Sequence, residues 1–322
     1  MKNDMKPNVV GIDIGGTNSV FGIVSKDGEV IASSSIKTQS YPVFEEYADA
    51  LCAGIKKLVE ETCGMDKIQG VGVGAPNANF YTGNIEHAPN LPWKGIVPFA
   101  KELSSRLGVP VALTNDANAA AIGEMTYGAA RGMKDFIMIT LGTGVGSGVV
   151  ANGQLIYGHD GFAGELGHVI VKRDGRDCGC GNKGCLETYT SATGVARTAR
   201  EFLEKRANED SLLRKIPTEQ ITSKDVYDAA VAGDTIAKDI FAFTGEVLGQ
   251  ALADFVKFSS PEAIVLFGGL AKSGDLLTVP MRQAMEDNLM PIFRNKVKIL
   301  LSGMKEADAA VLGASALGWD AK

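Results

Sequence analysis

Apolar residues alternate with polar ones near the beginning of the chain, and glycine turns interrupt the alternation. The first stretch runs from Val9 to Val24, turns at Lys26-Asp27-Gly28 and continues from Glu29 to Ser35. A hydrophobic period of two that is broken by tight glycine turns is typical of strands joined by hairpins. The pattern therefore predicts a meander of three antiparallel strands.

The same pattern begins again at Phe136. Ile139 to Gly144 aligns with Ile12 to Thr17, and Asn152 to Ile156 aligns with Asp27 to Ile31. The offset is 127 residues between Asp13 and Thr140 and 125 residues between Ile31 and Ile156, which two short indels would explain. We interpret this as a degenerate internal duplication. It predicts two similar α/β lobes with a central cleft, where small-molecule sites tend to lie.

Helical spacing and buried apolar runs fill the rest of the chain. Helices are predicted at 43–62, 99–107, 115–127, 195–214, 222–232, 235–258 and 307–318, and strands at 70–75, 109–114 and 263–267. The glycines at 245 and 249 suit close helix packing, and the final helix is expected to pack on the first lobe. We expect residues 1–115, with about 305–322, to form a small lobe and residues 116–304 to form a large lobe.

Composition narrows the class of protein. The chain has 322 residues, of which 45% are hydrophobic and 22% are charged, so it can bury a core and is not disordered. Its 39 glycines show no three-residue period, and no apolar run approaches the roughly 20 residues of a membrane span. A net charge of -6 disfavours nucleic acid and anionic membranes as partners. The segment before Val9 is short and polar. We therefore expect a cytoplasmic location and no helix-turn-helix ahead of the first strand.

Two glycine turns are candidates for phosphate binding. The chain has no Walker motif, and Gly142 to Gly146 has the wrong spacing for a dinucleotide fingerprint. In Asp13 to Asn18 and in Leu141 to Gly144, backbone N–H groups and a threonine hydroxyl could approach phosphate oxygens. Asp13 could also hold a hydrated magnesium ion. Either turn alone would be explained as a tight hairpin, whereas matching turns in a duplicated fold favour a functional role.

The pair Asn115-Asp116 follows an apolar strand and precedes an alanine-rich helix. Asn and Asp are preferred at helix N-termini, so capping alone would explain them. A carboxylate at such a junction could also take a proton from a hydroxyl group. The residues themselves leave both interpretations open.

A glycine-rich loop contains four potential metal ligands with the spacing H-x9-C-x-C-x4-C. They are His168, Cys178, Cys180 and Cys185. Three thiolates and one imidazole fill a tetrahedral zinc shell without an open position, so the zinc would be structural. A disulfide or three unpaired thiols are the alternatives, and the compartment and the spacing disfavour them. Folding around zinc would also bring Glu165 and Glu187 near each other.

Together these motifs resemble the ROK family (repressor, open reading frame, kinase) of sugar kinases over nearly the whole chain. The resemblance rests on Asp13 to Thr17, Asn115-Asp116, Glu165 to His168 and Cys178 to Glu187. It implies a pair of actin-like, ribonuclease-H-like lobes that bind ATP and a sugar, and transfer of the γ-phosphoryl group to a hexose hydroxyl. Asn77 stands where the family usually has Gly, and Ser19-Val20 where a basic residue is common.

The resemblance also implies roles for single residues. Asp116 would be the general base. Asn90, Asn115, Asp116, Glu165, His168 and Glu187 would bind the sugar, with His168 shared between zinc and the sugar. Asp13, Gly15, Gly16, Thr17, Asn18, Thr143, Gly144, Gly268 and Gly269 would bind ATP.

We expect Mg²⁺- and ATP-dependent phosphorylation of a hexose, with glucose converted to glucose 6-phosphate as the favoured reaction. An N-acetylmannosamine or N-acetylglucosamine kinase and a fructokinase are alternatives on the same residues. A sugar-sensing regulator is an alternative from another class, since some family members are repressors. A homodimer is implied by the resemblance alone.

Overall fold

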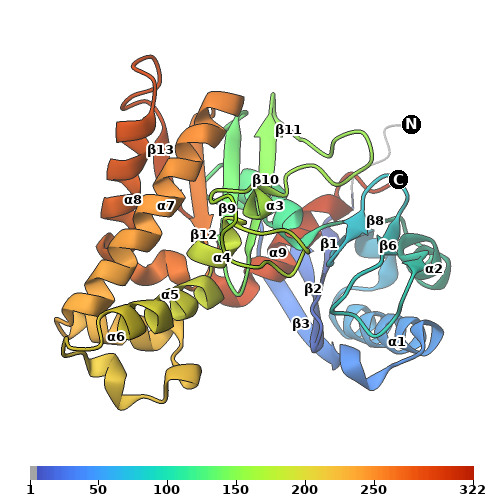
Figure 1. Ribbon diagram of the computed structural model, residues 1–322. Coiled ribbons are helices and arrows are strands. Elements are labelled where there is room, and N and C mark those ends of the chain that lie inside the picture. Colours follow the sequence, from blue (N-terminus) through green and yellow to red (C-terminus); the bar gives the residue numbers. More distant parts are fainter. Residues whose placement is uncertain (1–5) are drawn as a thin grey trace. The chain divides into compact units, whose positions relative to one another are not determined.

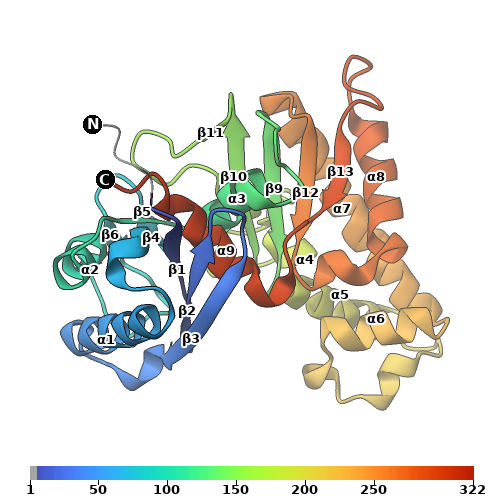
Figure 2. The same cartoon turned by 180° about the vertical axis from the view of Figure 1, so that it is seen from behind.

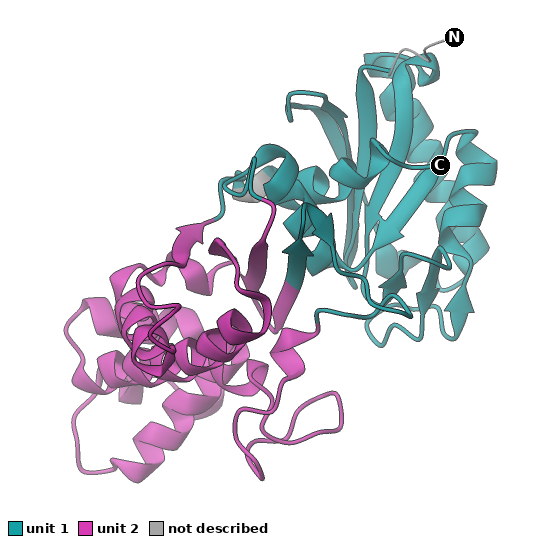
Figure 3. Ribbon diagram, turned by 90° about the horizontal axis from the view of Figure 1, so that it is seen from above, with its two compact units in different colours: residues 1–133, 148–164, 302–322 teal, residues 134–147, 165–301 magenta. Residues whose placement is uncertain are grey.

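The computed structural model describes residues 6–322, apart from the side chains of residues 306 and 307. The chain divides into two compact units (Figure 3). The first contains the chain up to Met133, Gly148–Gly164 and Ser302–Lys322. The second contains Lys134–Ser147 and Glu165–Leu301. This division groups residues 116–133 and 148–164 with the N-terminal segment, and the lobe boundary expected after residue 115 stays a prediction.

The first unit is built on a five-stranded sheet of order β3-β2-β1-β4-β8. Its strands are β1 (Asn8–Ile14), β2 (Asn18–Ser25), β3 (Val30–Lys37), β4 (Ile68–Gly74) and β8 (Val111–Thr114). The first three strands are antiparallel, which confirms the predicted meander. β4 and β8 continue the sheet in parallel with β1.

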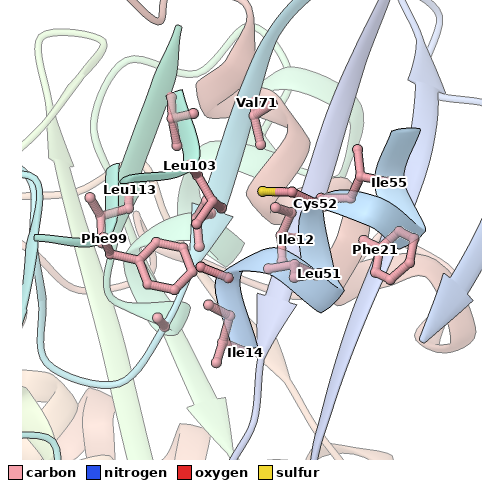
Figure 4. Close-up of a cluster of buried hydrophobic side chains, with 14 of the residues drawn as sticks. Ile12, Ile14, Phe21, Leu51, Cys52, Ile55, Val71, Phe99, Leu103 and Leu113 are labelled. Atoms are coloured by element: carbon pink, nitrogen blue, oxygen red, sulfur yellow. The ribbon is translucent and has the colours of Figure 1, made fainter. Parts of the chain in front are cut away.

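Helices pack on both faces of this sheet (Figures 1 and 2). α1 (Phe44–Thr62) and α2 (Phe99–Leu107) cover one face, and α3 (Asp116–Tyr127) and α9 (Glu306–Gly318) lie on the other. Figure 4 shows the core beneath α1, where Leu51 and Ile55 meet Ile12 and Phe21. Burial of these side chains stabilises the unit by roughly 2 kcal/mol for each one.

Two glycines explain why the final helix packs on the first unit, as predicted. A Cβ atom at Gly11 of β1 would overlap the carbonyl oxygen of Val311, and one at Gly72 of β4 would overlap that of Ala314. The bare strands thus let the backbone of α9 approach the sheet more closely than any side chain would permit.

A small antiparallel sheet in the first unit was not predicted. It consists of β5 (Ala78–Asn79), β6 (Asn84–Glu86) and β7 (Ile96–Val97) and lies between the strand predicted at 70–75 and the helix predicted at 99–107. Strands of two or three residues are too short to display an alternating pattern, so periodicity gives no signal for them.

The second sheet has the order β11-β10-β9-β12-β13, which repeats the first sheet strand for strand. Its strands are β9 (Phe136–Leu141), β10 (Val145–Ala151), β11 (Gln154–Leu155), β12 (Ala263–Phe267) and β13 (Lys298–Leu301). β12 is parallel to both β9 and β13, just as β4 is parallel to β1 and β8. The predicted duplication and its ribonuclease-H-like arrangement are confirmed. The division into units falls within β10.

The second unit is rich in helices. They are α4 (Glu187–Thr190), α5 (Ala192–Lys205), α6 (Ser223–Val231), α7 (Thr235–Ser259) and α8 (Asp275–Asn288). A Cβ atom at Gly249 of α7 would overlap the carbonyl oxygen of Met281 in α8, so the predicted close helix packing is confirmed. Short 3-10 turns occur in the chain at Thr38–Ser40, Met65–Lys67, Leu166–His168, Leu212–Lys215, Thr218–Gln220 and Leu270–Ser273.

The helix predicted at 195–214 is wrong in its extent. α5 ends at Lys205, and Leu212–Lys215 forms a separate 3-10 turn. The Ser211 side chain starts that turn by accepting a hydrogen bond from the Leu213 N–H. α8 was not predicted, since it contains Pro280 and proline usually interrupts helices. Within residues 6–322, no helix is long and apolar enough to cross a membrane.

Candidate active site and metal centre

Two carboxylates meet at one edge of the first sheet. Strand pairing aligns Asp13 of β1 with Gly74 of β4, and Gly74 with Thr114 of β8. Asp116 begins α3 two residues after Thr114. A Cβ atom at Gly74 would lie 3.6 Å from the Asp116 Cα, so the helix start lies against the strand ends. The fold therefore brings together Asp13 and Asp116, which are 103 positions apart in the sequence.

Loss of hydration within the surrounding protein dominates the electrostatics of this pair, although the Asp116 side chain is exposed and that of Asp13 is half-buried. It raises the pKa of Asp116, and the hydrogen bond from the Ala117 N–H offsets this only in part. Burial, followed by the charge of Asp116, raises the pKa of Asp13 to about 6. Adjacent carboxylates with raised pKa values are typical of sites that move a proton or hold a cation. These two acids are thus suited to either role.

The capping interpretation of Asn115 is correct. The Ala117 N–H donates to the Asn115 Oδ1 and to the Asp116 Oδ1, in both cases at 2.8 Å. The cap fixes the start of α3 and thereby the position of the Asp116 carboxyl group. Capping does not use the second oxygen of Asp116, so structural and chemical roles are compatible here.

The first glycine turn contacts the loop that carries Asn90. The Gly15 N–H donates to the Asn18 carbonyl oxygen at 2.9 Å and closes the hairpin. A Cβ atom at Gly16 would lie 2.8 Å from the Asn90 carbonyl oxygen. Trp93 supports this loop, since its ring centroid lies 4.3 Å from that of Tyr47. Asn90 therefore belongs to the same local cluster as the turn.

The structure explains the departure at Asn77. Its φ angle is 51°, in the left-handed region where glycine is favoured and asparagine is the best-tolerated alternative. The Asn77 Nδ2 also donates to the Glu86 carbonyl oxygen at 3.1 Å. Asparagine thus keeps the turn that a glycine would form.

The second glycine turn contacts Glu187. A Cβ atom at Gly144 would lie 2.7 Å from the Glu187 Oε2, and the Val145 N–H donates to that oxygen at 3.4 Å. On the other side of the turn, a Cβ atom at Gly268 would lie 2.5 Å from the Leu141 carbonyl oxygen. The second unit therefore gathers its predicted turn, acid and glycine pair around the ends of β9 and β12.

A pocket of about 390 Å³ opens beside this glycine pair. It is lined by Ser223, Lys224, Tyr227, Gly269, Leu270, Lys272 and Ser273. No atom outside the immediate chain neighbours lies within 4 Å of a Cβ placed at Gly269, so the backbone is open there. The pocket residues on α6 were not predicted, because the exposed face of that helix reads as an ordinary solvated surface.

The four predicted zinc ligands come together in the second unit. Their ligand atoms all lie within 4.8 Å of one another. In a tetrahedral site with Zn–S distances of about 2.3 Å, two sulfur atoms would be about 3.8 Å apart and a sulfur and a nitrogen about 3.6 Å apart. Cys180 Sγ lies 3.7 Å from Cys185 Sγ, and Cys178 Sγ lies 3.6 Å from His168 Nδ1. The donor set and its spacing fit zinc.

His168 lies between the two predicted carboxylates. Its Nδ1 faces the thiols and lies 3.7 Å from the Glu187 Oε1, whereas its Nε2 lies 4.0 Å from the Glu165 Oε2. One ring nitrogen is thus available to a metal while the other points to a second group, which would fix the tautomer. Glu165 and Glu187, which were expected to lie near each other, thus lie at the two nitrogens of one imidazole ring, within 4.0 Å of it.

The predicted site residues form two groups, one in each unit. The first contains Asp13, Gly15, Gly16, Thr17, Asn18, Asn90, Asn115 and Asp116. The second contains Thr143, Gly144, Glu165, His168, Cys178, Cys180, Cys185, Glu187, Gly268 and Gly269. Sequence reasoning missed Arg176. This buried arginine lies in the loop that carries the four predicted zinc ligands (residues 168–185, the metal loop), and nothing along the chain distinguishes it from a surface arginine.

A duplicated sheet of ribonuclease-H-like order, with a hairpin turn at equivalent places in each copy, defines an α/β protein of the actin-like class. Residues 9–321 match the model of the ROK family, and the chain belongs to that family. The glucokinase of Thermotoga maritima is 35% identical over 97% of this chain and 97% of its own length. The glucokinase of Halalkalibacterium halodurans is 37% identical, over 96% and 93%. A solved ROK family glucokinase from Streptomyces griseus, in complex with glucose and AMPPNP, has a TM-score of 0.79 and 33% identity, over 97% of this chain and 99% of its own.

Proposed function

We propose that this protein is an ATP-dependent hexose kinase that converts glucose to glucose 6-phosphate. One structural observation carries the proposal: Asp116, exposed to solvent and with a raised pKa, is fixed at the sheet edge next to Asp13. Relatives named glucokinase, at 35% and 37% identity over nearly the whole chain, support glucose as the substrate.

The first unit would supply the acid–base chemistry. Asp116 would accept the proton of the attacking hydroxyl group, and Asn115 and Asn90 would donate to and accept from sugar hydroxyls. The N–H groups of Gly15, Gly16, Thr17 and Asn18 would bind phosphate oxygens. Magnesium, when bound, neutralises charge on the transferring phosphates, and Asp13 is the residue that would hold it.

The second unit would bind both substrates. Glu165, Glu187 and the free nitrogen of His168 would accept or donate hydrogen bonds to sugar hydroxyls. Thr143, Gly144, Gly268 and Gly269 would contact the nucleotide. The pocket beside Gly269 adjoins these residues and would take the part of ATP that lies beyond the phosphates. Zinc, when bound, would stabilise the fold of the loop that carries His168.

Catalysis would consist of positioning and electrostatic stabilisation, since phosphoryl transfer demands little covalent chemistry from the protein. A cytoplasmic location follows from the need for ATP, and a homodimer from the family resemblance alone. Size-exclusion chromatography with light scattering measures the oligomeric state.

The decisive experiment is a coupled assay of purified enzyme with ATP and a panel of sugars. The panel contains glucose, mannose, fructose, N-acetylglucosamine and N-acetylmannosamine, and we expect glucose to have the highest kcat/KM. D116N should bind glucose with nearly unchanged Kd and lose at least about a thousandfold in kcat. A variant that retains a tenth of kcat refutes the assignment of the base.

The same panel separates the alternatives. Turnover of an N-acetyl sugar or of fructose in preference to glucose would reassign the substrate and keep the mechanism. Absence of turnover with every sugar, together with sugar-dependent binding to DNA in a gel-shift assay, would identify a regulator instead.

A further inference from the structure

Arg176 is the most completely hydrogen-bonded charged side chain of the metal loop. It lies two residues before Cys178, and only 6% of its side chain is exposed. Its Nε and Nη2 donate to the two carboxylate oxygens of Glu201, at 3.0 and 2.7 Å. Its remaining N–H groups donate to the carbonyl oxygens of Thr188 and Gly194 and to the Thr198 hydroxyl, at 2.6, 3.3 and 2.9 Å. All five guanidinium donors thus have partners.

The backbone around Arg176 is fixed by the same neighbours. Its N–H donates to the Tyr189 hydroxyl at 3.0 Å, and its guanidinium lies 4.4 Å from the centroid of the Tyr189 ring. Its carbonyl oxygen accepts from the Gly184 N–H at 2.7 Å, next to Cys185. The side chain and main chain of one residue therefore join both arms of the metal loop to α4.

α4 begins at Glu187, the acid that faces His168 and the second glycine turn. The Thr188 carbonyl oxygen bound by Arg176 belongs to the next residue along the chain. Rotation or displacement of α4 would move the Glu187 carboxylate directly. Arg176 is thus linked to Glu187 through its hydrogen bond to the adjacent residue, Thr188, and it lies two residues before Cys178 along the chain.

Glu201 holds Arg176 from α5. Burial acts to raise the pKa of Glu201, but the hydrogen bonds and charge of Arg176 outweigh it, so the pKa is lowered and the carboxylate stays ionised. The planar guanidinium matches both carboxylate oxygens at once, which a lysine ammonium group cannot do. Buried ion pairs contribute little net stability because of desolvation, so orientation is the better explanation for this one.

We propose that Arg176, held by Glu201, is a positioning residue that sets the place of Glu187 for the sugar and so controls the affinity for glucose. This inference rests on the proposed function, in which Glu187 binds sugar hydroxyls. Groups that orient a binding residue from behind typically change affinity or activity by about 10- to 100-fold when they are removed. Glu187 also contacts the second glycine turn, but the other proposed nucleotide contacts, Gly268 and Gly269, lie on a separate segment, so the KM for ATP should change less than the KM for glucose.

R176K tests the inference, because it keeps the positive charge and removes the bidentate hydrogen bonding to the Glu201 carboxylate. We expect the KM and the calorimetric Kd for glucose to rise about tenfold, with kcat within twofold and a smaller change, below about threefold, in the KM for ATP. Zinc content, measured by mass spectrometry, should stay at one per chain. R197K is the matched control: Arg197 also pairs with Glu201, at 3.4 Å, but 42% of its side chain is exposed. We expect no change in R197K.

The outcomes separate the two proposals. A wild-type enzyme that does not phosphorylate glucose refutes the proposed function and this inference with it. An active wild type with an unchanged glucose KM in R176K refutes this inference alone. Parallel loss of kcat, both KM values and thermal stability would show a purely structural role and also overturn it. If R176K does not fold, E201Q keeps the shape of the partner and should raise the glucose KM, whereas an unchanged KM refutes the inference.

Discussion

Replacement of Asp13 by asparagine should stabilise the ligand-free protein while it impairs catalysis. Burial and the Asp116 charge raise the pKa of Asp13 from 3.8 to about 6. A rise of about two units corresponds to about 3 kcal/mol against folding at neutral pH, and partial exposure of the side chain reduces this to about 2 kcal/mol. Asparagine has nearly the same shape and no charge, so D13N removes this unfavourable term.

The sign of the pH dependence follows from proton binding. Between pH 3.8 and about 6, the folded protein holds more protons on Asp13 than the unfolded chain, so its contribution to stability falls as pH rises. The unfolding free energy of D13N should therefore exceed that of the wild type by a gap that widens by about 1 kcal/mol between pH 5 and pH 8.

Urea unfolding of the zinc-loaded, ligand-free proteins at pH 5, 6.5 and 8 measures this gap. In a D116N background the effect of D13N should be smaller, because one of the two causes of the raised pKa is gone. With ATP and magnesium, D13N should lose at least about tenfold in kcat/KM, since the carboxylate that we propose to hold magnesium is missing. A gap that is constant over this pH range would refute the electrostatic reasoning, whatever the activity.

Three further predictions concern the metal, the sheet and a helix N-terminus. Removal of zinc with a chelator should lower the melting temperature and the glucose affinity together, and a zinc-free protein that stays folded and active would contradict this. Gly72→Ala should destabilise the protein by about 1–3 kcal/mol in urea unfolding, whereas Gly179→Ala, with open space around it, should change it by less than about 0.5 kcal/mol. Burial acts to raise the pKa of Asp234, but hydrogen bonds from Ala237 and other donors outweigh this, so the pKa is lowered. Asp234→Asn should therefore cost about 1 kcal/mol of unfolding free energy at pH 7. The cost should shrink as the pH falls through the native pKa, which urea unfolding at several pH values measures.

The sequence predicted the parts of the fold that have a local periodic signal. The alternation around Gly15 and again around Gly142 indicated the duplication, because three strands joined by tight turns leave a clear pattern. α2 and β12 were predicted to the residue: α2 lies between a proline and a glycine and has one buried face, and β12 is a continuous apolar run that ends at a glycine and is buried on both faces. The helix predicted from residue 222 corresponds to α6, which begins at a capping box formed by Thr222 and Asp225.

What the sequence could not predict depends on partners that are distant along the chain. The final helix was expected to pack on the first lobe, but nothing near Gly11 or Gly72 indicates that these two strand positions are where α9, more than 230 residues later, makes its contact. The position of Arg176 was also not predictable, since it depends on Glu201 and on carbonyl oxygens of α4 and α5. Its charge would suggest a surface position, and only the folded loop shows five paired donors.

The candidate site was more predictable than the packing, for a chemical reason. Metal ligands must lie within a few ångströms of one ion, so the spacing of His168, Cys178, Cys180 and Cys185 carries three-dimensional information that an apolar pattern lacks. The pair Asp13 and Asp116 carried no such constraint. Their proximity arises from the parallel register of β1, β4 and β8.

The two copies of the duplicated fold have the same strand order but differ in charge at their first turns, since one copy has an acid there and the other a neutral residue. In the first copy the position before the turn is Asp13, an acid with a raised pKa. The equivalent position in the second copy is Thr140, whose hydroxyl accepts a hydrogen bond from the Gly146 N–H at 3.1 Å and carries no charge. Under the proposed function, in which both turns bind phosphates, an acid at both positions would place two carboxylates there, and each would repel the nucleotide unless a cation accompanied it. One acid and one hydroxyl would let a single magnesium ion suffice, and the duplicated scaffold would thereby separate the proposed cation site at Asp13 from the neutral turn at Thr140.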